Sequence, residues 1–232
     1  MSGKSGSRLT HFFSLRIPQS SSLTGSVVSL HEEIMREFKD IPSEALLPSS
    51  SYHLTLAVCS LTNSQLVEKA INGLYELRLR FEEEHDSIWP NAPLVVSLRG
   101  LDVWRSYGRR IPDATGIMFA KVVDESGDGA IQTFADAVKN YFINLGLVIL
   151  DERTSRPVSL HATVIKMARK ISSRSKDSRS RYVNSKFDPR PLIQKFECRQ
   201  LLSTTRLPVL ELCRMGIRPD GTYECVASID LP

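Results

Sequence analysis

The sequence predicts an α+β fold of two pseudo-symmetric β-α-β-α-β lobes, with mainly antiparallel sheets flanking a central cleft. One observation is a duplicated motif, since His-Leu-Thr-Leu at 53–56 recurs as His-Ala-Thr-Val at 161–164. A second is the order of the hydrophobic patterns, which alternate between the period of a strand and that of a helix in the same way in both halves. Two units of matching order predict two lobes, each lending one His strand to the cleft.

The spacing of the strands supports this duplication. The first strand of the N-terminal half starts at Thr10, 43 residues before His53. The first strand of the second half starts at Thr115, 46 residues before His161. The two His strands therefore occupy matching positions.

In the first half, residues 10–17 combine aromatic and β-branched side chains and end at a proline, which predicts a strand. Apolar residues at helical spacing predict an amphipathic helix over 24–39. The Thr-Asn-Ser-Gln sequence at 62–65 is a capping pattern, and it opens a long helix to about residue 84. Residues 94–98 follow as a further strand.

The second half repeats the order and adds strands. We expect a strand at 115–123, a helix at 128–145 capped by Asp128, a short strand at 147–150, the second His strand, a helix at 188–197 opened by Asp188-Pro189, and strands at 207–213 and 222–229. The Pro-Asp-Gly sequence at 219–221 is a turn signal between the last two strands.

The length and the amino-acid composition are those of an ordinary globular chain, with 232 residues, of which 41% are hydrophobic and 24% are charged. Its longest apolar runs are too short to span a bilayer, so no membrane association is expected. Four cysteines, Cys59, Cys198, Cys213 and Cys225, lack the spacing of a zinc site or a disulfide framework. We therefore expect a reducing compartment, the nucleus or the cytoplasm.

We interpret residues 1–9 as a disordered polar lead and 10–232 as a single bilobal domain, with lobe-forming repeats at about 10–104 and 115–232. The net charge is +4, and between 166 and 190 nine Lys or Arg stand against two acidic residues. The basic loop 168–186 could guide an RNA strand, act as a nuclear-import signal or be a solvated loop.

The two His-x-Thr motifs are the candidate catalytic residues. In a strand, residues two apart share a face, so His53 lies beside Thr55 and His161 beside Thr163. A single such pair is most often structural, but two at matching points of a repeat favour a shared site. One neutral imidazole could take a proton, an imidazolium could give one to a leaving oxygen, and the hydroxyls could hold a phosphate. This chemistry requires no metal and no cofactor.

The chain resembles the two-histidine phosphoesterase superfamily, whose LigT-like members carry His-x-Thr/Ser-apolar on two lobes. It is most similar to the branch with the nuclear-localisation-signal-type domain of A-kinase anchoring proteins and the phosphoesterase-like domain of activating signal cointegrator complex subunit one. The resemblance rests on Thr-His-Phe-Phe-Ser-Leu at 10–15, the two motifs, Leu-Glu-Leu-Cys-Arg-Met at 210–215 and Asp-Gly-Thr-Tyr at 220–223.

The resemblance implies a metal-independent phosphodiesterase for RNA-type phosphodiesters: 2′,3′-cyclic phosphates, RNA 3′ ends or 2′-5′ oligonucleotides. The alternative is a non-catalytic module that binds a nucleotide or an RNA end within a larger nuclear complex. We expect a monomer whose partner is RNA or a nucleotide. The residues leave open which histidine is the acid.

Four further residues are candidate substrate contacts. Trp104 and Tyr107 could stack on a nucleobase, with Arg105 near the phosphates. Arg156 lies in the loop that leads into the second His strand. The structural alternative is that the aromatic rings only pack and the arginines are only solvated.

Overall fold

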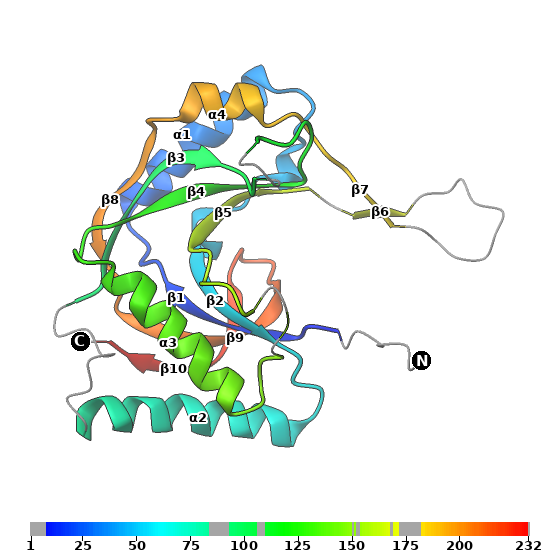
Figure 1. Ribbon diagram of the computed structural model, residues 1–232. Coiled ribbons are helices and arrows are strands. Elements are labelled where there is room, and N and C mark those ends of the chain that lie inside the picture. The colour runs from blue at the N-terminus through cyan, green and yellow to red at the C-terminus, as the bar shows by residue number, and fades with distance from the viewer. Residues whose placement is uncertain are drawn as a thin grey trace.

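The computed structural model describes residues 8–83, 93–105, 110–149, 151, 154–167, 169–171 and 182–231 (Figure 1). The elements of the first half are β1 (His11–Arg16), α1 (Ser21–Glu37), the 3₁₀ turns η1 (Ser43–Ala45) and η2 (Ser49–Ser51), β2 (His53–Cys59), α2 (Ser64–Glu83) and β3 (Val95–Asp102). Those of the second half are β4 (Ile117–Asp124), α3 (Ala130–Asn144), β5 (His161–Lys166), β6 (Arg169–Ile171), β7 (Tyr182–Asn184), α4 (Arg190–Phe196), β8 (Gln200–Arg206), β9 (Val209–Ile217) and β10 (Tyr223–Asp230).

Two four-stranded antiparallel sheets form the body of this α+β fold, as predicted. The first has the order β10-β9-β1-β2 and the second the order β5-β4-β3-β8. The two His strands, β2 and β5, are therefore edge strands, and they contact each other across the gap between the sheets. A backbone hydrogen bond of 2.9 Å from Leu47 N to Val164 O ties the chain before β2 to β5.

The sheets exchange strands between the two halves of the sequence. β3 leaves the first half to pair with β4 and β8, whereas β9 and β10 return from the second half to pair with β1. The ranges 10–104 and 115–232 therefore each give strands to both sheets, and neither range folds into one sheet by itself.

The structure differs from the prediction at one expected strand, which does not form, and at β8, which was not expected. Residues 147–149 form no strand, because the amide groups of Leu147 and Val148 donate to the carbonyl oxygen of Phe142 at the end of α3, at 3.0 and 3.2 Å. β8 was not predicted, since only Leu201 and Leu202 are buried among its otherwise polar residues. It lies at the edge of its sheet, where polar residues are tolerated.

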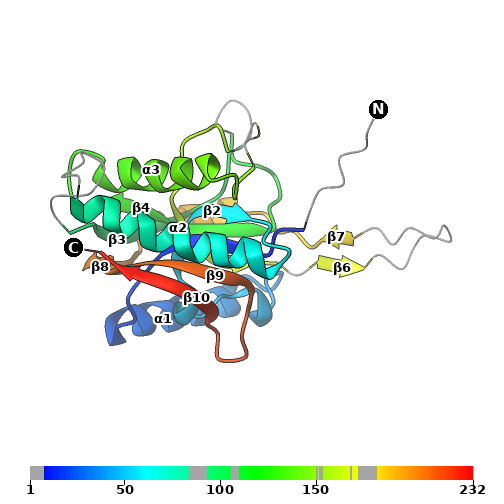
Figure 2. The ribbon, with the colours of Figure 1, turned by 90° about the horizontal axis from the view of Figure 1, so that it is seen from below.

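The helices cover the outer faces of the sheets. α2 contacts β9 and β10, and α3 contacts β2, so both cover the first sheet and lie side by side (Figures 1 and 2). α1 contacts β8 and α4 contacts β3, so these two cover the second sheet. Each helix that follows the first strand of a half thus covers the sheet of the other half, which interlocks the two lobes.

Hydrogen bonds at the helix ends explain where the helices begin. The Ser20 hydroxyl accepts from Leu23 N at 3.1 Å, and Asn63 Oδ1 accepts from Leu66 N at 2.8 Å. Asp128 does not cap α3 as predicted. Instead Asp124, at the end of β4, accepts from Ile131 N at 3.2 Å, and Asp128 has a φ of 52° in the preceding turn.

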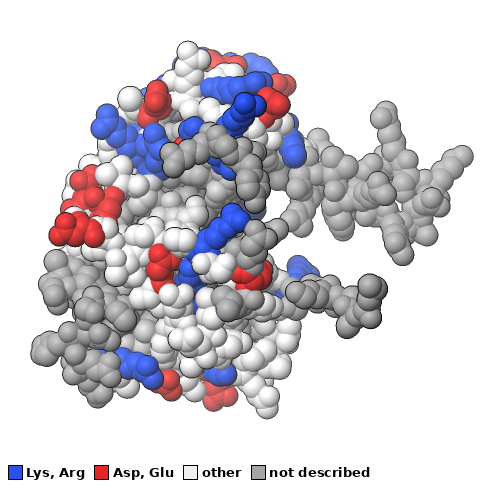
Figure 3. All heavy atoms as spheres, in the orientation of Figure 1, with Lys and Arg blue, Asp and Glu red and all other residues white. Residues whose placement is uncertain are grey.

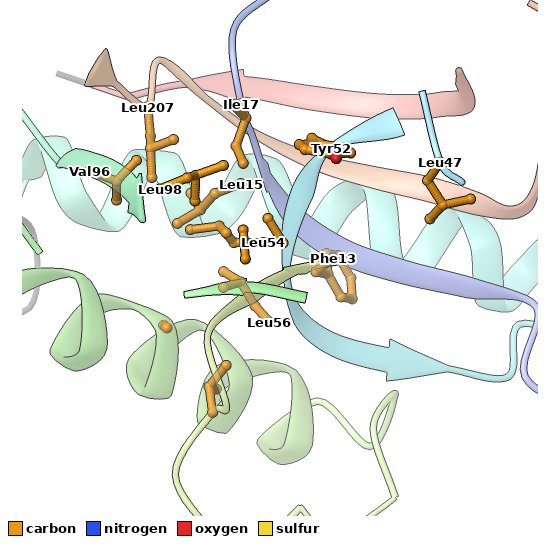
Figure 4. Packing of buried hydrophobic residues seen from close by; sticks show 14 of the residues in the cluster. Phe13, Leu15, Ile17, Leu47, Tyr52, Leu54, Leu56, Val96, Leu98 and Leu207 are labelled. Atoms are coloured by element: carbon orange, nitrogen blue, oxygen red, sulfur yellow. The ribbon is translucent and has the colours of Figure 1, made fainter. Parts of the chain in front are cut away.

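One connected cluster of buried side chains fills the space between sheets and helices (Figure 4). Leu54 and Leu56 of β2 point into it beside Phe13 and Leu15 of β1, and the rings of Phe13 and Phe142 stack with centroids 3.6 Å apart. Burying each such side chain stabilises the fold by about 1.5–3 kcal/mol. This burial fixes the parity of β2, so that His53 and Thr55 must face away from the core.

Within the described residues, no helix combines the length and the apolarity needed to cross a bilayer. β6 and β7 pair as a short ribbon that projects from the body (Figures 1 and 2). Most of the basic loop 168–186 lies outside the described residues. Over the described part of the face in Figure 3, Lys and Arg are interspersed with Asp and Glu.

Candidate active site

Both His-x-Thr motifs start a strand and keep the predicted alternation. His53 and Thr55 are half-buried on either side of Leu54, which is 0% exposed. His161 and Thr163 are half-buried on either side of Ala162 in the same way. In the first motif the Thr55 hydroxyl lies 3.0 Å from His53 Nε2.

The two imidazole rings are oriented by equivalent backbone contacts. His53 Nδ1 lies 2.7 Å from the carbonyl oxygen of Ser51, and His161 Nδ1 lies 2.6 Å from that of Ser159. A carbonyl oxygen only accepts, so Nδ1 carries the hydrogen in both rings. Nε2 is therefore the basic nitrogen in both, and the Thr55 hydroxyl donates to the one in His53.

Aromatic rings pack against each imidazole. Phe12 and Tyr223 lie beside His53, with ring centroids 4.8 and 5.0 Å away. Trp104 and Phe119 lie beside His161, with ring centroids 4.8 and 5.2 Å away. Each histidine thus packs against two aromatic rings, so the two motifs have equivalent surroundings.

Burial lowers the pKa of both histidines. For His53 the pKa falls to about 4, because burial disfavours the charged ring and the positive charges of His161 and Lys166 act in the same direction, against the hydrogen bond to Ser51. For His161 burial also lowers the pKa, opposed by the hydrogen bond to Ser159. Both rings are therefore neutral at pH 7 in the unliganded protein. The strands β2 and β5 contact each other, so the two motifs are neighbours in the fold.

A cavity of about 200 Å³ beside His53 is lined by His53, Thr55, Thr163, Lys166 and Tyr223, whereas the His161 ring is not part of its lining. Its rim includes residues 215–217 at the end of β9 and Leu47 before β2. Two hydroxyls, an imidazole and an ammonium group thus face one small volume. This combination is suited to an anion of phosphate size.

Of the four predicted substrate contacts, only Trp104 is seen in contact with a motif histidine among the described residues. Trp104 lies against His161 with 44% of its surface exposed. Arg105 pairs with both oxygens of Asp102, at 3.1 and 3.2 Å. Arg156 is exposed, and its carbonyl oxygen accepts from Lys139 Nζ at 2.5 Å. Tyr107 lies outside the described residues.

Sequence reasoning did not single out Phe12, Phe119, Lys166 or Tyr223 as residues of the site. Lys166 ends the second His strand, five residues after His161, so strand parity alone does not place it beside the motif. Phe12 and Tyr223 belong to stretches that support the family resemblance, which was the available signal. Their contact with His53 depends on strand pairing between distant segments.

Hydrogen bonds from α3 fix the backbone of the segment that leads into β5 and His161. Asp136 of α3 accepts from Val158 N at 2.7 Å and from Lys139 Nζ at 3.1 Å. Gln132 donates to Asp136 at 2.7 Å and to the carbonyl oxygen of Val158 at 3.0 Å. The helix therefore fixes the backbone three residues before the ring.

A relative by sequence is activating signal cointegrator 1 complex subunit 1 of Mus musculus, 27% identical over 159 residues. The match covers 67% of this chain and 42% of that protein, so the chain spans less than half of the relative's length.

Solved structures of similar fold include TT0787 of Thermus thermophilus, with a TM-score of 0.54, 16% identity and coverage of 96% of this chain and 97% of that one. E. coli LigT complexed with 3′-AMP has a TM-score of 0.53 at 15% identity, with coverage of 96% and 98%. At these identities the likeness shows the fold alone.

Residues 9–231 match the family described as the AKAP7 2′5′ RNA ligase-like domain. This match spans both His-x-Thr motifs and every strand and helix that the structure describes. The chain belongs to this family, a branch of the two-histidine phosphoesterase superfamily.

Proposed function

We propose that the chain is a metal-independent phosphodiesterase that acts on RNA-type phosphodiesters by general acid–base catalysis with His53 and His161. Family membership supports the reaction class, and the observation that favours catalysis is the matched pair of imidazoles. Each has its Nδ1 hydrogen bonded to a backbone carbonyl and its Nε2 basic, and the strands that carry them contact each other.

In this proposal His53 is the base and His161 the acid. His53 has the pKa near 4, because it is buried and repelled by two positive charges, so it remains unprotonated and can accept a proton. Burial lowers the pKa of His161 against the hydrogen bond to Ser159, and a bound phosphate anion favours its imidazolium form. A bound phosphate would thus separate the two pKa values, as an acid–base pair requires.

For a 2′,3′-cyclic phosphate, the oxygen of a water molecule attacks phosphorus while its proton passes to His53 Nε2. The bond from phosphorus to one ribose oxygen breaks, and His161 Nε2 donates its proton to that oxygen. Thr163 and Lys166 hold the non-bridging oxygens, where negative charge increases, and the Thr55 hydroxyl turns from His53 Nε2 to the same oxygens when the ring takes up the proton. Trp104, exposed beside His161, stacks on a base.

The test is hydrolysis of a 2′,3′-cyclic nucleotide and of 2′-5′ and 3′-5′ dinucleotides in the presence of a chelator. We expect turnover of at least one of them, with kcat/KM highest at mildly acidic pH, above about 4 and below 6.5. His53→Gln and His161→Gln should each lower kcat by about 10²–10⁴. His31→Gln, on α1 over the outer face of the second sheet, is the matched control and should leave kcat unchanged.

Nucleotide binding without turnover of any substrate would favour the alternative, a module that binds a nucleotide or an RNA end. Activity that disappears with the chelator and returns with a metal would exclude the mechanism described above.

A further inference from the structure

A second cavity, of about 330 Å³, adjoins the first on the other side of His53. The two cavities share Phe12, His53 and Tyr223 as a common wall. The second one lies over the inner face of the first sheet. Alternate residues of three strands line it: Phe12, Ser14 and Arg16 of β1, Glu211 and Cys213 of β9, and Tyr223 and Cys225 of β10.

The floor of this cavity is polar although it is buried. Ser14 is 1% exposed and Glu211 is 5% exposed. A buried carboxylate is unfavourable unless it is paired, and Glu211 forms an ion pair with Arg16, whose side chain is half exposed. The lining also includes Tyr52, whose buried hydroxyl has no hydrogen-bond partner among the described residues.

Strand register relates this floor to the proposed phosphate site. Thr55 pairs with Ser14, and Ser14 pairs with Glu211, so the three residues form one row across β2, β1 and β9. Adjacent strands are about 4.8 Å apart, so the Glu211 position lies about 10 Å from the Thr55 position. A ribose and a base span a distance of this order from their phosphate.

We propose that this cavity binds the nucleobase on the His53 side of the phosphate, and that Glu211 and Arg16 contact the hydrogen-bonding edge of the base. The inference rests on the proposed function for the position of the phosphate. Phe12 and Tyr223 supply aromatic surface at the entrance, beside His53. Gln19 and Ser50 also line the cavity, where the Gln19 amide pairs with Ser49 and the Ser50 hydroxyl donates to the carbonyl oxygen of Gly221.

The chemistry of the ion pair favours one base. An ionised Glu only accepts hydrogen bonds and an Arg only donates them. Guanine offers the carboxylate two N–H groups, on N1 and on the exocyclic amine, and offers the guanidinium its O6 oxygen. Uracil has a single N–H on its edge, so it leaves one of these contacts unmade. The cavity should therefore prefer guanine over uracil.

The experiment compares the binding of the 3′- and 5′-monophosphates of guanosine, adenosine, cytidine and uridine by calorimetry. We expect at least one guanosine monophosphate to bind about tenfold or more tightly than its uridine counterpart, because a charged hydrogen bond is lost with uracil. Glu211→Gln should reduce that ratio to below about threefold. Glu224→Gln is the matched control, since Glu224 pairs with Arg214 at 3.3 Å on the same hairpin and lines neither cavity.

Ser14→Val tests the same cavity by filling it. Ser14 lies on the floor, and the added methyl groups should weaken nucleotide binding while inorganic phosphate binds as before. Circular dichroism and thermal unfolding establish that each variant is folded.

Equal affinities for the four nucleotides, or a base preference that Glu211→Gln leaves intact, would contradict the proposal that this cavity binds the base. Neither result would affect the assignment of the histidines. A guanine preference that depends on Glu211, in a protein without turnover, would support the pocket and count against the enzymatic proposal.

Discussion

His53 and His161 have the same tautomer but different electrostatic surroundings. The contact from Nδ1 to a carbonyl oxygen two residues earlier is repeated in both motifs. Lys166, however, lies in the cavity beside His53, and its charge adds to burial in lowering the pKa of that ring. A single lysine thus helps to distinguish two otherwise equivalent residues.

Lys166→Met should raise the pKa of His53, because the variant removes a positive charge that repels the imidazolium. The same change should lower kcat/KM for a phosphodiester by about tenfold, since a charged contact to the phosphate is lost. NMR titration of the imidazole protons checks the first effect, and steady-state kinetics the second. Lys195→Met, on α4, is the control, and an unchanged His53 titration in Lys166→Met would contradict the electrostatic assignment.

The sequence predicts which side chains share a face, but not which strands become neighbours. The alternation of His53, Leu54 and Thr55 is visible in the sequence, because a buried Leu between two polar residues sets the parity. The contact of His53 with Tyr223 depends on β9 and β10 joining the sheet of β1. No local pattern encodes that choice, and for this reason the sequence did not predict Phe12, Phe119, Tyr223 and Lys166 as residues of the site.

At the level of elements, α3 acts as a support for the second His strand. Asp136 holds the backbone at Val158 and pairs with Lys139, whose side chain is 8% exposed. Asp136→Asn should lower the free energy of unfolding by about 2–4 kcal/mol, because it leaves the Lys139 charge buried without its partner. The double variant Asp136→Asn with Lys139→Met should recover part of this loss in urea unfolding. A double variant no more stable than the single one would show that the buried charge is not the cause.

The pairing of β3 with β4 is irregular between Leu98 and Leu101, and the backbone there requires a glycine. Gly100 has a φ of 72°, and a Cβ at this position would overlap the carbonyl oxygen of Glu197 at the end of α4. Gly100→Ala should therefore lower the free energy of unfolding by at least about 2 kcal/mol. Gly25→Ala is the matched comparison, since Gly25 lies within α1 with nothing near its Cβ position, and it should stabilise by about 0.5–1 kcal/mol. Thermal unfolding of the two variants should shift in opposite directions.

Most helices and strands follow from local patterns, and the exceptions have identifiable causes. Asn63 and Ser20 cap helices near the predicted starts. The α3 cap comes instead from Asp124, which is outside the helix and seven residues before Ile131. The apolar run at 147–150 suggests a strand, but its first amides complete the end of α3. In both cases a contact from a neighbouring element overrides the local signal.

For the molecule as a whole, buried histidines make stability depend on pH. The folded pKa of His53 is about 4, below the ordinary value of 6.5, so between these values the unfolded chain binds more protons. The free energy of unfolding should therefore fall as pH decreases from 6.5 to about 4, by about 2–3 kcal/mol from this residue. The pKa values of His11, His31 and His161 are also lowered by burial and add in the same direction.

Urea unfolding at a series of pH values measures this slope. His53→Gln should make the slope shallower, whereas a slope equal to that of the native protein would show that His53 is not buried in its neutral form.

The exchange of strands between the two halves also sets an order of events during translation. A ribosome releases the chain from its N-terminus, so His53 and His161 are both synthesised before residues 209–230. Until then β1 lacks β9 as its neighbour, and the Tyr223 ring is not present to cover His53. A nascent polypeptide that already contains both histidines therefore lacks one of the rings that pack on His53 until the last hairpin emerges.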